Sequence, residues 1–135
     1  MALTVYHTTS KGNGKLIAQQ GWEVDNSGTN IYGRGVYFWG QMDDAHAYGL
    51  AVYGKDNYDI VSENIPVTST NSVTYDHAKA RGSHIDDIAQ GLIARGVDVV
   101  VITNPHIESS TLSRAKGKAY LWLVDMRHDK RVVKY

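Results

Sequence analysis

The chain has 135 residues, which suits one domain spanning 1–135 and is too short for two domains of ordinary size. It has no cysteine, which excludes disulfides and thiolate metal sites. Fourteen basic residues balance fourteen acidic ones, which disfavours non-specific coating of DNA or RNA. No apolar run approaches the roughly 20 residues that span a bilayer, so we expect no membrane association and a cytoplasmic location.

The N-terminal half is predicted to contain two strands and two helices. A β-prone run predicts a strand over Leu3–His7, and a helix should follow over Lys15–Gln20, ended by Gly21. A β-branched and aromatic run between glycines predicts a strand over Gly35–Trp39. Ala-rich sequence with acidic residues at its start predicts a helix over Asp43–Tyr53.

The C-terminal half is dominated by strand signals. Strands are predicted over Tyr58–Thr70, Asp98–Thr103, Tyr120–Asp125 and Arg131–Tyr135. Pro66 places part of the first of these at a sheet edge. The apolar spacing within Ser83–Arg95 predicts a helix that Gly96 ends. This order of elements favours an α+β domain with a split or mixed sheet over a regular βαβ repeat.

Three features could carry chemistry, and each also has an ordinary structural explanation. His7 could be a surface histidine at a strand end. The run Gly33–Phe38 has two glycines two residues apart, which allow close approach of a ligand to the main chain, but it lacks the third glycine of a dinucleotide fingerprint. Tyr48 and Val52, four residues apart, could both be core residues of one helix.

Together, these features resemble the diphtheria-toxin and poly(ADP-ribose) polymerase branch of the ADP-ribosyltransferases, the His-Tyr-Glu type. The matching pattern is YHTT…GW…N…YGRGVYFW…A…Y. In that family a first-strand histidine precedes a glycine-flanked strand, and a second tyrosine follows the first by eleven residues. His7, the Gly33–Phe38 run, Tyr37 and Tyr48 match in order and spacing. The resemblance covers roughly residues 4–53 well and the later strands loosely.

The resemblance implies two small packed β-sheets that form an NAD-binding cleft, with a few flanking helices. It implies that His7 bonds a ribose hydroxyl of NAD⁺ and that the backbone at Thr8 holds the nicotinamide carboxamide. Tyr37 and Tyr48 would sandwich the nicotinamide ring, and Gly35 and Ala45 would also line the site. Aromatic faces suit a cationic pyridinium, and breaking the nicotinamide–ribose bond passes through an oxocarbenium-like state.

Two residues depart from the family pattern. Thr8 stands where the family often has glycine, which adds a Cβ near the ligand but keeps the backbone donor. Ala45 stands where the family often has a small hydroxyl residue that donates to the carboxamide, so one contact would be missing.

The family also uses a late-strand glutamate, and the chain has only three glutamates. Glu23 follows the first predicted helix and is interpreted as a solvated residue. Glu63 could be a surface or a site residue, and Glu108 is preferred by its order along the chain. An alternative alignment of KAYLWLVD puts no carboxylate at the family position, which would fall on Lys118, Ala119 or Tyr120.

The resemblance implies a mono-ADP-ribosyltransferase with NAD⁺ as substrate and His7, Tyr37 and Glu108 as its catalytic residues. Two alternatives stay open: an NAD⁺ glycohydrolase, and a non-catalytic module on the same fold that binds NAD⁺, ADP-ribose or a partner. The acceptor that the resemblance implies is a macromolecule, either a protein or a nucleic acid. We expect a monomer that acts in its own cytosol or in that of a host cell. The histidines lack HxxxH or HExxH spacing, so no metal site is expected.

Overall fold

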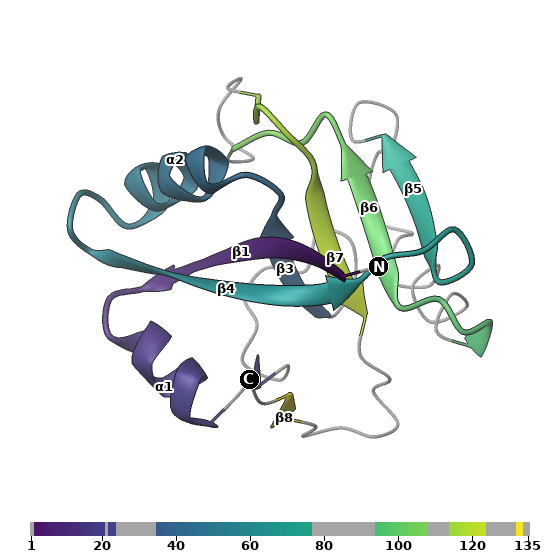
Figure 1. Cartoon of the computed structure of the whole chain (residues 1–135). Coiled ribbons are helices and arrows are strands. Elements are labelled where there is room, and N and C mark those ends of the chain that lie inside the picture. The colour runs from purple at the N-terminus through teal and green to yellow at the C-terminus, as the bar shows by residue number, and fades with distance from the viewer. Residues whose placement is uncertain are drawn as a thin grey trace.

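A computed structural model describes residues 2–20, 22–23, 35–76, 94–107, 114–123 and 132–133 (Figure 1). These residues form a mixed α+β arrangement. In chain order the elements are β1 (Ala2–Ser10), α1 (Asn13–Gln20), β2 (Trp22–Glu23), β3 (Gly35–Trp39), α2 (Met42–Val52), β4 (Tyr58–Pro66), β5 (Ser72–Asp76), β6 (Val99–Thr103), β7 (Ala119–Leu123) and β8 (Val132–Val133).

Most of the strands belong to one sheet, in the order β4-β1-β3-β7-β6-β5, while β2 and β8 pair separately. The pairs in this six-stranded sheet are antiparallel except for β5 with β6, which run parallel. The α+β class is confirmed. The expected two small packed sheets are not the main β structure, because β3 pairs on one side with β1 and on the other with β7 and so joins the two halves into one sheet.

The join between the halves is narrow. β1 and β4 pair along nine residues, and β3 and β7 pair along five. Between β1 and β3 the register contains a single pair, Tyr6 with Trp39. In Figure 1, β1 and β4 run across the view while β5, β6 and β7 run steeply, so the two halves take different directions on either side of this join. The sheet is therefore split at the edge where β1 meets β3.

A helix covers each face of the β1–β4 half. We call the face that carries Val5 and Phe38 the α1 face, because Ile17 of α1 packs with them. The opposite face, which carries Tyr37 and Trp39, is the α2 face. In Figure 1, α1 lies below β1 and β4 and α2 lies above them. Alternation along β6 supplies apolar side chains to both faces, which explains its uninterrupted VVVIT sequence.

Two N-terminal boundaries differ from expectation. The strand predicted over Leu3–His7 extends to Ser10, because β4 pairs with it as far as Ser10–Tyr58. His7 therefore lies inside a strand and not at its end. The first helix begins at Asn13, before the predicted Lys15, because Asp59 accepts hydrogen bonds from the main-chain N–H groups of Gly12 and Gly14 and caps this end.

The predicted strand Tyr58–Thr70 stops at Pro66 as β4, which is an edge strand as Pro66 indicated. A turn follows in which the Asn71 side chain accepts from the Thr68 N–H at 2.7 Å and donates to the Pro66 carbonyl at 2.9 Å. The sequence analysis missed the strand after this turn, β5. Its exposed and half-buried residues lack a clear period-two pattern.

The remaining predicted elements agree with the structure where it describes them. Strand β3 has the predicted bounds, and α2, β6 and β7 match within two residues. Of the predicted helix Ser83–Arg95, only Ala94 and Arg95 lie within the described residues, and Gly96 follows with φ +83°. Neither described helix is long and apolar enough to cross a membrane.

Candidate functional site

His7 and Tyr37 meet at the split between β1 and β3. The Nδ1 atom of His7 lies 2.6 Å from the main-chain oxygen of Tyr37. The imidazole also stands edge-on to the ring of Phe38, with ring centroids 5.9 Å apart. Because His7 follows Tyr6, this hydrogen bond links the two strands one residue beyond their single backbone pair, Tyr6 with Trp39.

This contact determines which nitrogen of His7 carries the proton. Burial lowers the pKa of His7 below the usual 6.5, and the hydrogen bond to Tyr37 opposes that shift only in part. The ring is therefore neutral at pH 7. A carbonyl oxygen can only accept, so Nδ1–H is the donor, and Nε2 carries the lone pair. Nε2 is thereby an acceptor suited to a hydroxyl group.

Tyr48 lies on the same face of the sheet as Tyr37. Its ring packs against Trp39 of β3, with centroids 5.7 Å apart, and against Tyr53, with centroids 6.5 Å apart. Trp39 and Tyr37 are two residues apart on one strand and so share a face. The α2 face at β3 therefore carries a group of partly exposed aromatic rings, Tyr37, Trp39 and Tyr48.

Thr8 ties β1 to the helix that carries Tyr48. Its hydroxyl donates to the main-chain oxygen of Ala45 at 2.8 Å, and Thr8 and Ala45 are both buried. The threonine side chain is thus directed at the first turns of α2. The Thr8 hydroxyl therefore lies beside Ala45 and is bonded within the protein.

The three matched side chains approach the split from two sides. By strand alternation, His7 belongs to the α1 face with Val5 and Phe38. The rings of Tyr37 and Tyr48 belong to the α2 face. His7 and the two tyrosine rings therefore leave opposite faces of the sheet, which differs from the expectation that all three side chains line one surface. The contact between His7 and Tyr37 is made to the main-chain oxygen of Tyr37, at the edge where the pairing of β1 and β3 ends.

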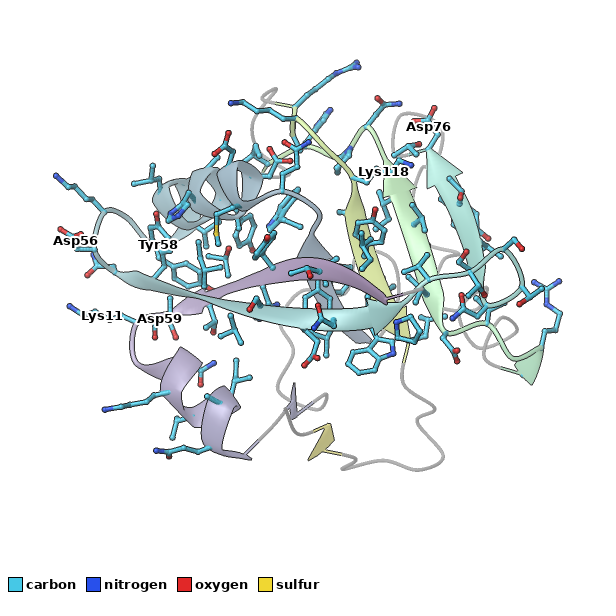
Figure 2. All side chains as sticks on the ribbon, viewed as in Figure 1. Lys11, Asp56, Tyr58, Asp59, Asp76 and Lys118 are labelled. Atoms are coloured by element: carbon cyan, nitrogen blue, oxygen red, sulfur yellow. The ribbon has the colours of Figure 1, made fainter. Side chains whose placement is uncertain are left out.

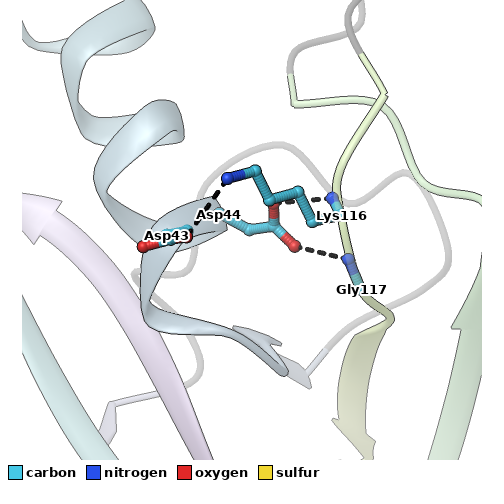
Figure 3. Close-up of polar contacts among 4 residues, drawn as sticks. All are labelled: Asp43, Asp44, Lys116 and Gly117. Atoms are coloured by element: carbon cyan, nitrogen blue, oxygen red, sulfur yellow. Dashed lines mark hydrogen bonds and ion pairs between the residues drawn. The ribbon is translucent and has the colours of Figure 1, made fainter.

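A buried carboxylate secures the start of α2 (Figure 3). The two oxygens of Asp44 accept the main-chain N–H groups of Lys116 and Gly117, each at 2.8 Å. The Lys116 ammonium reaches Asp43 at 3.2 Å, but both side chains of that pair are exposed. The segment before β7 is also bonded through the Gly40 N–H, which donates to the Lys118 oxygen at 2.8 Å. The sequence analysis used the acidic residues here only as a sign of a helix start and missed this link.

Of the three candidate glutamates, only Glu63 has its side chain among the described residues. Glu108 lies outside them, as does the side chain of Glu23. Glu63 lies on β4 opposite Val5, so the whole of β1 stands between its backbone and β3. The start of β7 carries Ala119 and Tyr120, which pair with Trp39 and Phe38 and offer no carboxylate.

Two further titratable side chains of the described residues, Tyr120 and Asp59, do not supply this carboxylate. Burial raises the pKa of Tyr120, so its phenol stays protonated and cannot replace a carboxylate. Figure 2 shows Asp59 beside α1 at the start of β4, where it caps that helix.

The glycines of the predicted motif are described only in part. Gly35 is the first residue of β3 and pairs with Leu123, whereas Gly33 lies outside the described residues. Among the residues described, no three His, Asp or Glu side chains gather as metal ligands would.

Comparisons with protein-family models, with curated proteins and with solved structures found no match to this chain.

Proposed function

We propose that this chain binds NAD⁺ and transfers a single ADP-ribose from it to a macromolecular acceptor. The observation that supports this most is the neutral His7 imidazole, bonded through Nδ1–H to the Tyr37 main chain beside a strand whose α2 face carries Tyr37, Trp39 and Tyr48. The proposal assigns the nicotinamide to the aromatic group and the adjoining ribose to Nε2 of His7.

The chemistry explains why these residue types suit the reaction. The glycosidic bond between ribose C1′ and the nicotinamide nitrogen breaks, nicotinamide leaves with the bonding electron pair, and an oxocarbenium-like sugar remains. An acceptor nucleophile then bonds to C1′ and gives up its proton to a base. Aromatic faces attract the cationic pyridinium of the substrate and hold it flat. A neutral imidazole can orient the ribose by accepting from a hydroxyl without adding positive charge beside the developing cation.

Glu108 remains our preferred residue for orienting the acceptor and accepting its proton. This preference rests on the position of Glu108 in the order of elements along the chain. Water as the acceptor would give NAD⁺ hydrolysis by the same first step. The experiment below therefore measures both products.

A second candidate function, binding without catalysis, rests on a specific observation. The segment that begins β7 has no carboxylate at Lys118, Ala119 or Tyr120. The Thr8 hydroxyl, which could have met the carboxamide, instead bonds Ala45. A domain with these features could hold NAD⁺ or ADP-ribose and leave the glycosidic bond intact.

The decisive experiment incubates the protein with cell extract and NAD⁺ labelled in the adenylate part. Mass spectrometry of protein and nucleic acid reports transfer, and chromatography reports free ADP-ribose and nicotinamide. Labelled macromolecules support the transferase, and free ADP-ribose alone supports the hydrolase. Calorimetric NAD⁺ binding with no nicotinamide release selects the non-catalytic module, and the absence of both binding and turnover contradicts the proposal.

A further inference from the structure

We propose that Asp44 is a positioning residue of the NAD⁺ site: its carboxylate holds the 116–117 backbone against the first turn of α2 and so sets where the Tyr48 ring stands over β3. This inference rests on the proposed function for its ligand, but the geometry that carries it does not. Asp44 is only 2% exposed, and each of its oxygens accepts one main-chain N–H at 2.8 Å.

A buried carboxylate needs such partners, because removing its charge from water is costly unless hydrogen bonds compensate. Here the donors come from a segment 72 residues further along the chain. The two N–H groups are consecutive and point at one carboxylate (Figure 3), which fixes both the distance and the orientation of the helix start relative to β7. The exposed pair between Asp43 and Lys116 adds little to this, because solvent screens it.

Steric contacts also bring the start of α2 close to the segment before β7; we call this contact the α2–β7 junction. A Cβ at Gly117 would lie 2.9 Å from Cγ of Gln41, and a Cβ at Gly40 would lie 3.0 Å from the main-chain oxygen of Lys118. Neither glycine has a positive φ, so close approach rather than backbone conformation accounts for the lack of a side chain. The main chain of Lys118 thus approaches Gly40 closely, and at Gly117 the Gln41 side chain occupies the space that a Cβ would take.

The α2–β7 junction sets the position of the Tyr48 ring because Tyr48 follows Asp44 by four residues, about one helical turn. On its other side the same stretch of α2 is tied to β1 by the Thr8–Ala45 hydrogen bond. Two fixed points at neighbouring residues leave the helix little freedom to shift. The Tyr48 ring is then held against Trp39 at a centroid distance of 5.7 Å.

The test compares Asp44→Asn with Asp43→Asn, which removes the same charge from the adjacent residue. An amide has only one acceptor oxygen and presents an N–H₂ group to the other backbone donor. We expect Asp44→Asn to raise the NAD⁺ dissociation constant about tenfold or more, equivalent to about 1.4 kcal/mol. It should also weaken the nuclear Overhauser contacts between the Tyr48 and Trp39 rings, while Asp43→Asn should change neither result.

A second pair of variants keeps the proposal testable if Asp44→Asn does not fold. Gly117→Ala places a methyl group against Gln41, and Gly117→Ala with Gln41→Ala removes the obstructing atoms. We expect the first to weaken the Tyr48–Trp39 ring contacts and the second to restore them. Ring contacts that stay unchanged in the Asp44 and Gly117 variants would overturn the inference. An intact wild-type ring contact with no NAD⁺ binding would instead contradict the proposed function.

Discussion

The imidazole of His7 donates a hydrogen bond to the main-chain oxygen of Tyr37 across the one place in the sheet where neighbouring strands share a single register pair. A side chain thus takes over where the backbone ladder between β1 and β3 ends. The bond fixes the tautomer of His7 and leaves Nε2 as an acceptor. This relationship links the stability of the split to the proposed chemistry, and both can be measured.

Substitutions of His7 test the roles of its two ring nitrogens separately. In His7→Asn the side-chain amide can still donate to Tyr37, but the acceptor at the position of Nε2 is lost. We expect NAD⁺ affinity to fall by about tenfold, corresponding to one hydrogen bond of about 1 kcal/mol or slightly more. His7→Ala should lower both NAD⁺ affinity and the free energy of unfolding. Isothermal titration calorimetry and urea unfolding measure the two effects, and full NAD⁺ affinity in both variants would contradict the role of Nε2.

The lowered pKa of His7 predicts a pH dependence of stability. Between the unfolded value near 6.5 and the lower folded value, the unfolded chain binds more protons than the folded protein. The contribution of His7 is therefore fully present above pH 7 and is lost as pH falls from about 6.5 toward the folded pKa. Unfolding free energies of wild type and His7→Asn, measured from pH 8 to pH 5, isolate this contribution because both proteins share the other histidines. A difference that stays constant over that range would show that the pKa is not lowered.

Tyr48 should act through its ring and not through its hydroxyl. Tyr48→Ala removes the contact with Trp39 and the proposed stacking on nicotinamide, so we expect NAD⁺ affinity to fall on the order of tenfold. Tyr48→Phe keeps the ring and should retain affinity within about twofold. Calorimetry with NAD⁺ checks both variants. Unchanged NAD⁺ affinity and turnover in a folded, active Tyr48→Ala protein would remove this residue from the site.

Thr8 provides a prediction about stability that is independent of NAD⁺. Thr8→Val keeps the shape of the side chain but removes the donor to the buried Ala45 oxygen. We expect the free energy of unfolding to fall by about 0.5–1.5 kcal/mol, the net contribution of one hydrogen bond, because the Ala45 oxygen lies within α2 and keeps its intrahelical partner. Thr8→Ser keeps the hydroxyl and should lose less. Urea denaturation of the three proteins measures this order, and equal losses in both variants would show that packing, not the hydrogen bond, matters here.

The carboxylate assignment is tested by exchanging glutamates for glutamines. Glu108→Gln should lower ADP-ribose transfer by about a hundredfold, within the range expected for loss of a general base, with little change in NAD⁺ affinity. Glu63→Gln, on the far side of β1 from β3, is the matched control and should transfer ADP-ribose at the wild-type rate. Transfer is followed by mass spectrometry. Loss of transfer in Glu63→Gln alone would reverse the assignment.

Local sequence patterns predicted much of the secondary structure. The aromatic and β-branched run of β3 lay between glycines and matched its predicted bounds, and the apolar run of β6 was recognised within one residue. Boundaries failed where a distant partner decided them. β1 runs past His7 because β4 pairs with it, and α1 begins early because Asp59 caps it. These partners lie more than 40 residues away and leave no local signal.

The sequence likewise predicted one part of the candidate site and missed another. The resemblance to the ADP-ribosyltransferases singled out His7, Thr8, Tyr37, Ala45 and Tyr48, which the structure places on the adjoining elements β1, β3 and α2. Spacing did not indicate that His7 and the tyrosine rings leave opposite faces of the sheet. It also gave no sign that Asp44 holds the segment before β7, because a helix-start aspartate has an ordinary explanation in the helix dipole.

The sequence by itself determined the α+β class, most of the described elements and the residue types available for chemistry, because these follow from short-range periodicity and from the side chains themselves. The tertiary structure decided that the main β structure is one split sheet, which nitrogen of His7 holds the proton, and what the Asp44 carboxylate binds. Each of these depends on groups that only folding brings within hydrogen-bonding distance.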